Sequence, residues 1–93
     1  MKYSVFCFKD KQLGLYTVPS VSQLSDPEDL KDDVRAQIIK SDKRDVFKGK
    51  DLVYLGTYDN KTGLYDTKDP EFLLNCDQVI SEAYDYERSK QEA

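Results

Sequence analysis

Residues 2–9 show the alternation of side chains that is typical of a β-strand. The segment is rich in aromatic and β-branched residues, which favour strands. Alternation divides it between two faces, with Tyr3, Val5 and Cys7 on one and Ser4, Phe6 and Phe8 on the other. Residues 10–14 have the composition of a turn, with Gly14 at a position where a positive φ is favoured. Residues 15–18 are the returning strand, which ends at Pro19. We therefore predict an N-terminal β-hairpin.

Residues 25–40 have the spacing of an amphipathic helix. The apolar stripe is narrow and consists of Leu30, Val34 and Ile38. Two starts are compatible with the sequence: Asp26 as N-cap with Pro27 in the first turn, or a capping box formed by Ser25 and Glu28. Either start predicts a helix that packs one face and exposes the others to water.

A second hairpin follows the helix. Residues 51–58 are a strand pattern, residues 59–63 a turn pattern, and residues 64–67 a return strand. The longer strand divides into Val53 and Leu55 on one face and Leu52, Tyr54 and Tyr58 on the other. Both hairpins contain the pattern Asp-x-x-x-Gly-Leu-Tyr, at residues 10–16 and 59–65, which supports two turns of the same kind.

The C-terminal third is less regular. Residues 72–76 fit a short extended segment or the start of a helix equally well. Apolar positions from Asp77 recur at helical spacing and predict a helix to about Arg88, with an acidic, frayed tail at residues 89–93.

These elements predict one α+β domain over residues 1–93, in which two antiparallel hairpins form one sheet with a connecting helix and a C-terminal helix (ββα-ββ(α)). Both faces of the predicted sheet are apolar or aromatic, and the helices cover only one of them. The other face then needs a second copy of the chain, the tail, or a ligand that stacks on aromatic rings.

Composition excludes several kinds of chemistry. The 93 residues include no histidine, which removes histidine-based nucleophile pairs and histidine metal sites. Cys7 and Cys76 are far apart in the sequence and form no redox or zinc motif, so we expect them to be small core residues. Asp66, Asp69 and Glu71 are acids without a metal-site pattern. We therefore expect no enzyme activity, no metal site and no cofactor.

The formal charge of −4 is unevenly distributed. Residues 26–33 carry −4 and the chain from Asp66 onward carries −5, whereas residues 40–50 carry +3. Such a basic segment is either a solvated connection between two elements or a site for phosphates. The aromatic residues of the sheet can stack on unpaired bases while the basic segment contacts phosphates, so the two together are a candidate nucleic-acid interface. The candidate side chains are Lys9, Lys11, Lys40, Lys43, Arg44, Lys48, Lys50, Phe6, Tyr54 and Tyr58.

Three segments together resemble a known family. They are Lys2-Tyr3-Ser4-Val5, the hairpin Asp10-x-x-x-Gly14-Leu15-Tyr16-x-x-Pro19, and the hairpin Tyr54-x-x-Gly56-x-Tyr58-Asp59-x-x-Thr62-Gly63. In this order, with an acidic helix between them, they resemble the small non-structural protein of gokushovirus-type microviruses, which are single-stranded DNA phages. The resemblance implies a DNA-binding protein that acts between genome replication and packaging, and it brings no catalytic residues.

Two functions follow as expectations. The first is a dimeric phage accessory protein that binds single-stranded DNA or the replication complex. The alternative is an adaptor that engages a viral or host replication or capsid protein through its aromatic sheet face without touching DNA. No apolar run approaches the roughly 18 residues of a membrane span, and the N-terminal residues lack the apolar region of a signal peptide, so we expect the cytoplasm of the bacterial host rather than a membrane or secretion.

Overall fold

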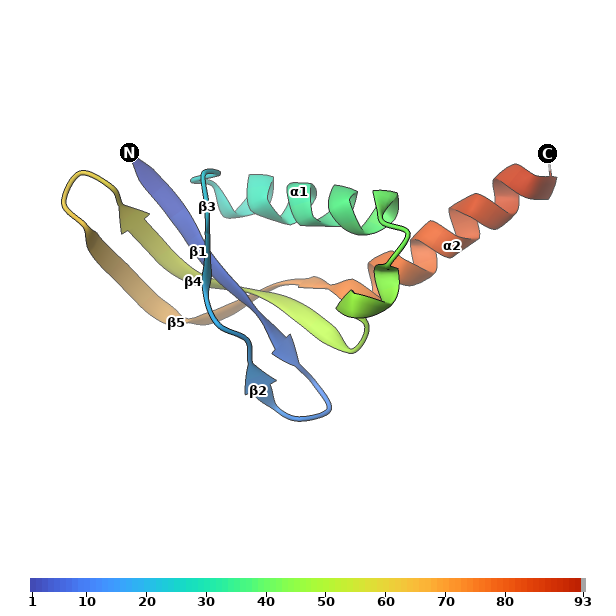
Figure 1. Cartoon of the computed structure of the whole chain (residues 1–93), viewed down its shortest axis with the longest axis horizontal. Coiled ribbons are helices and arrows are strands. Elements are labelled where there is room, and N and C mark those ends of the chain that lie inside the picture. The colour runs from blue at the N-terminus through green and yellow to red at the C-terminus, as the bar shows by residue number, and fades with distance from the viewer. Residues whose placement is uncertain (93) are drawn as a thin grey trace.

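Five strands in one antiparallel sheet and two α-helices build the structure, a computed structural model that describes residues 1–92 (Figure 1). The α+β class predicted from the sequence is confirmed. In chain order the elements are β1 (Lys2–Asp10), β2 (Leu15–Tyr16), β3 (Ser20–Ser22), α1 (Pro27–Lys40), the 3-10 helix η1 (Arg44–Phe47), β4 (Lys50–Asp59), β5 (Leu64–Asn75) and α2 (Cys76–Glu92).

The strands lie in the order β2-β1-β4-β5, and β3 also pairs with β1. The sequence pattern does not predict β3, which forms because the chain returns to β1 after Pro19 and sets Val21 opposite Val5. Residues 72–75, which fit strand or helix, continue β5, and α2 begins at the next residue. Of the segment expected to be a frayed tail, α2 includes residues 89–92, and residue 93 lies outside the described residues.

The core lies between the helices and one side of the sheet. The predicted stripe of α1 is buried, and Asp26 is its N-cap, with a carboxylate oxygen that accepts a hydrogen bond from the backbone N–H of Glu28 at 2.9 Å. Each fully buried leucine or isoleucine of this core contributes about 2 kcal/mol of hydrophobic free energy. Residues of the sheet that pack in it are Phe6, Phe8, Leu52, Tyr54 and Leu74.

One extra residue in β4 changes which side chains face the helices. The extra residue is Leu55, because the pairs on either side of it are Val5–Gly56 and Phe6–Tyr54. Such a β-bulge reverses the alternation of the strand. Tyr54 therefore faces the helices, whereas Tyr58 pairs with Tyr3 on the opposite side. The prediction that Tyr54 and Tyr58 share one face is wrong.

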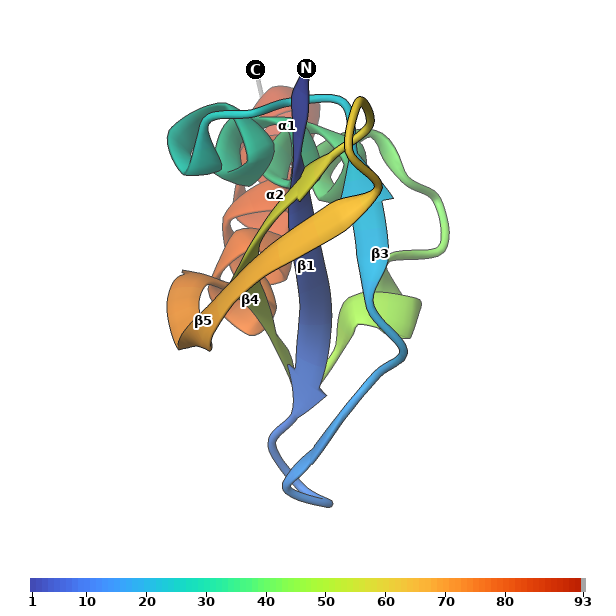
Figure 2. The ribbon, with the colours of Figure 1, turned by 90° about the vertical axis from the view of Figure 1, so that its left-hand side faces the viewer.

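We call the side of the sheet without helices the open face (Figure 2). Its central residues are Tyr3, Val5, Cys7 and Lys9 of β1 and their partners Tyr58, Gly56, Val53 and Asp51 of β4. The sheet is curled, and Val5, Cys7 and Val53 are at most 4% exposed within a single chain. The aliphatic middle of the open face therefore needs no second copy to bury it.

Gly56 lies in close contact with the backbone of β5. Its φ is 133°, and a Cβ built on it would lie 2.1 Å from the backbone oxygen of Asp66 and 2.9 Å from the Cα of Thr67. Only glycine allows both this φ and this contact. Gly56 therefore allows β5 to cross β4 at the angle that curls the sheet.

Arg44 joins the end of α1 to α2. Its Nε donates to the carbonyl oxygen of Ile38 at 3.1 Å, and its Nη2 donates to the carbonyl of Ile39 and to the carboxylate of Glu87. Arg44 is only 8% exposed, so the expectation that it is a solvated cation of the basic segment is wrong. The unpaired carbonyls at the helix end attract the guanidinium, and the guanidinium lowers the pKa of Glu87.

We predict that Gly56→Ala lowers the free energy of unfolding by more than about 2 kcal/mol, because the methyl group collides with β5 and the φ is strained. Gly63→Ala is the matched control: its φ of 72° is also positive, but a Cβ there meets nothing within 4 Å. We expect Gly63→Ala to cost about 1 kcal/mol. Urea unfolding of both variants measures the difference, and equal losses would contradict the close contact at Gly56.

We predict that Arg44→Met lowers the melting temperature by several degrees, whereas Lys43→Met, at the exposed neighbouring position, leaves it unchanged. Because the folded-state pKa of Glu87 is lowered, the stability that this ion pair adds is present at neutral pH and is lost as the pH falls through that pKa. The difference between wild type and Arg44→Met in thermal melts should therefore shrink in acid. A difference that stays constant with pH would exclude the contribution of Glu87.

Candidate nucleic-acid interface

Two of the three aromatic side chains assigned to the interface lie in the core. Tyr54 is 8% exposed, and Phe6 packs against Phe8 and the helices. The Nζ of Lys68 lies 5.6 Å from the centre of the Tyr54 ring, on which a base would otherwise have to stack. The prediction that Phe6 and Tyr54 are open to unpaired bases is therefore corrected: they stabilise the fold.

Tyr58 lies on the open face, in the middle of three neighbouring tyrosines that we call the tyrosine row: Tyr3, Tyr58 and Tyr65. Strand register places the three on β1, β4 and β5 directly opposite one another. The ring centres of Tyr58 and Tyr65 are 4.8 Å apart, and those of Tyr3 and Tyr58 are 6.3 Å apart. Tyr65 is 60% exposed. The row is a continuous aromatic surface at one end of the sheet.

A second aromatic group lies at the other end of the open face, six residues and about 20 Å further along β1. It surrounds a pocket of about 200 Å³ lined by Lys9, Tyr16, Asp51, Val53, Pro70 and Phe72. The rings of Tyr16 and Phe72 are half-exposed or more. Sequence reasoning missed Tyr16, Tyr65 and Phe72, although the repeated Gly-Leu-Tyr marks the first two at equivalent positions after the hairpin turns.

The candidate cations gather at the end of the sheet away from the tyrosine row. Lys9 and Lys11 are at the end of β1, Lys48 and Lys50 are at the start of β4, and Lys40, Lys43 and Arg44 flank the end of α1. Tyr58 and Lys50 are eight residues apart along β4, roughly 25 Å. The single groove expected from the basic segment and the three rings is therefore not formed.

Several of these cations already have partners within the chain. Lys50 donates from Nζ to the carbonyl oxygen of Val46 at 2.7 Å, and Arg44 is buried as described. The Nζ of Lys9 lies 5.6 Å from the centre of the Tyr16 ring, on the open face. Lys40, Lys43 and Lys48 are exposed. Lys9 is thus the candidate cation nearest to exposed aromatic rings.

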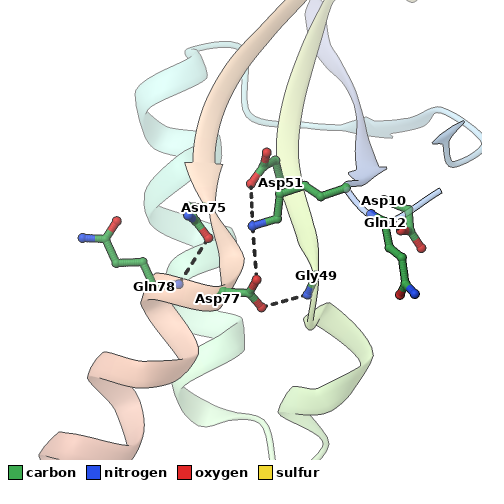
Figure 3. A network of polar contacts seen from close by, with 8 residues as sticks. Asp10, Gln12, Gly49, Asp51, Asn75, Asp77 and Gln78 are labelled. Atoms are coloured by element: carbon green, nitrogen blue, oxygen red, sulfur yellow. Dashed lines mark hydrogen bonds and ion pairs between the residues drawn. The ribbon is translucent and has the colours of Figure 1, made fainter. Parts of the chain in front are cut away.

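Lys11 belongs to a polar network at the junction of three elements (Figure 3). Its Nζ donates to Asp77 at 3.1 Å and lies 3.7 Å from Asp51, while Asp77 also accepts from the backbone N–H of Gly49 at 2.8 Å. The Gly49 amide, followed by Lys11, lowers the pKa of Asp77, and Asp77 raises the pKa of Lys11. The network fastens the turn after β1 to the starts of β4 and α2, so Lys11 has a structural role.

The cysteines and the acids singled out in the sequence are the remaining candidates for reactive groups. Cys7 and Cys76 are free and buried, and burial raises the pKa of both thiols, that of Cys76 to about 11. Across the described residues, no three acidic or cysteine side chains are grouped as metal ligands, and Glu71 forms an ion pair with Lys68 at 2.7 Å.

A further cleft of about 430 Å³ lies between the helices rather than on the sheet. It is lined by Arg35, Ile39, Glu82, Ala83 and Tyr86, and an ion pair of 2.6 Å between Arg35 and Glu82 borders it. Tyr86 is 59% exposed. The C-terminal part of α2 projects beyond the sheet (Figure 1). No sequence pattern singles out this cleft, because α1 and α2 are brought together only by folding.

Among residues 1–92, no helix is both long and apolar enough to cross a membrane. Comparison of the chain with models of known protein families, with curated proteins and with solved structures finds no match.

Proposed function

We propose that the chain is a non-enzymatic accessory protein of a single-stranded DNA phage and binds single-stranded DNA during genome replication and packaging in the host cytoplasm. The observation that carries the proposal is the tyrosine row on the open face. The resemblance of the two hairpins to the microvirus non-structural protein supports the same function.

The tyrosine row suits unpaired bases for a physical reason. Stacking of one base on an aromatic side chain contributes about 1–3 kcal/mol and needs a ring face that is free. Three rings on adjacent strands, one of them 60% exposed, offer such faces over a continuous surface. In a duplex the bases are already stacked and paired. The surface therefore favours single strands.

Electrostatics gives a smaller part of the binding free energy. The chain carries a formal charge of −4, and of the candidate cations only Lys9 lies among the central residues of the open face. Each phosphate contact to a single strand adds about 0.7 to the slope of log affinity against log salt concentration. We expect a shallow slope, which corresponds to one or two contacts.

An adaptor that binds another replication or capsid protein is the second candidate. The observation that favours it is the cleft between α1 and α2, where Ile39, Ala83 and Tyr86 form an apolar surface beside an ion pair. Grooves of this kind accept the apolar face of a partner helix. The two functions use different surfaces, so variants on each surface separate them.

We predict that Tyr65→Ala weakens binding to oligo(dT) about tenfold, because one stacking surface is lost. Tyr86→Ala is the matched control, since the two side chains are 60% and 59% exposed and only Tyr65 is on the open face. Fluorescence anisotropy at low salt measures both. Failure of the wild type to bind any single strand would overturn the proposed function and favour the adaptor.

We also propose a homodimer through the outer edge of β5, the last strand of the order β2-β1-β4-β5, where Leu64 is 68% exposed. Pairing at this edge leaves the tyrosine row and the rest of the open face free for a single strand. Sedimentation at high micromolar concentration should show a dimer for the wild type and for Tyr86→Ser. The double variant with Leu64→Lys and Asp66→Lys, which places positive charges on this edge strand and leaves Tyr65 and Phe72 in place, should be monomeric. A monomeric wild type, or a dimeric double variant, would contradict this interface.

A further inference from the structure

The pocket between β2, β4 and β5 on the open face combines apolar walls with charged groups. Tyr16 and Phe72, which are 50% and 61% exposed, stand beside a floor formed by Val53, which is 4% exposed. The volume of about 200 Å³ suits one flat heterocycle but not a folded peptide segment. Two aromatic side chains beside an aliphatic floor are a site for a planar ring.

Asp51 gives the pocket a hydrogen-bond acceptor. Its side chain is 19% exposed and lines the pocket, and its Oδ1 is enclosed without a hydrogen-bond partner. The Nζ of Lys11 is 3.7 Å from this oxygen, which is an ion-pair distance but too long for a hydrogen bond. Oδ1 is therefore enclosed beside Lys11, and a ligand in the pocket meets the exposed part of the carboxylate. Carboxylate oxygens only accept hydrogen bonds, so they favour a ligand that donates N–H groups.

We propose that this pocket holds one unpaired nucleobase and prefers a base with an amino group, that is cytosine, adenine or guanine, over thymine. The inference rests on the proposed function and deepens it by naming the base. An exocyclic amino group donates to the carboxylate of Asp51, as in the known contact of acidic side chains with cytosine. Thymine presents carbonyl oxygens on both sides of its single N–H, and these oxygens repel a carboxylate.

Lys9 adds a positive charge to the pocket. It is the β1 partner of Asp51, and its ammonium group lies beside the Tyr16 wall, 5.6 Å from the centre of that ring. In this position it meets the phosphate of the bound nucleotide and offsets the negative charge of Asp51. An apolar ligand would use neither charge, which is why a nucleotide fits this pocket better.

The test compares oligo(dC) and oligo(dT) of equal length in anisotropy titrations. We expect the wild type to prefer oligo(dC) about fivefold or more. Asp51→Asn should bring the ratio of the two affinities close to one, because an amide both donates and accepts. Asp66→Asn, which removes the same charge from an exposed position of β5 outside the pocket, should keep the ratio. Phe72→Ala should weaken both oligonucleotides, since it removes a wall.

The outcomes separate the inference from the function on which it rests. Equal binding of both oligonucleotides by the wild type, or an unchanged ratio in Asp51→Asn, overturns the base preference and leaves single-strand binding intact. No binding of either oligonucleotide overturns the proposed function and the inference with it. The wild-type comparison requires no variant, so it decides the question even if Asp51→Asn fails to fold.

Discussion

The close contact of β5 with Gly56, together with the extra residue Leu55 beside it, determines the rest of this structure. The bulge reverses the alternation of β4, so that Tyr54 enters the core and Tyr58 reaches the open face. The absent side chain at Gly56 lets β5 cross closely enough to curl the sheet, and the curled sheet buries Val5 within a single chain. A side chain at position 56 would therefore affect both stability and the surface on which the proposed function depends.

The curled sheet creates an open face with aromatic groups at its two ends and a buried aliphatic middle. The tyrosine row at one end offers stacking without base selection, because every base has a π-face. The pocket at the other end adds a carboxylate and an ammonium group. Under the proposed function, a net charge of −4 gives little attraction to phosphates, so stacking and one polar contact supply most of the affinity for a single strand.

Counting the positive charges of the basic segment overestimates the number of cations that are available to bind phosphates. Arg44 is held by the carbonyls at the end of α1 and by Glu87, and Lys11 is held by Asp77. Both cations join elements that are distant in sequence, and both would have to break these contacts to meet a phosphate. Lys43 and Lys48 remain exposed, but they lie far from the tyrosine row.

The sequence by itself determined the elements whose signals are local: the hairpin turns, the helix at residues 27–40 with its buried stripe, and the α+β class. Glycines, capping residues and helical spacing act within a few residues, which is why they can be recognised along the chain. Tertiary structure decided the bulge at Leu55, the strand at residues 72–75 and the partners of Arg44. Each of these depends on a contact between distant segments, and a shift of one residue in strand register is enough to move a tyrosine from one face of a sheet to the other.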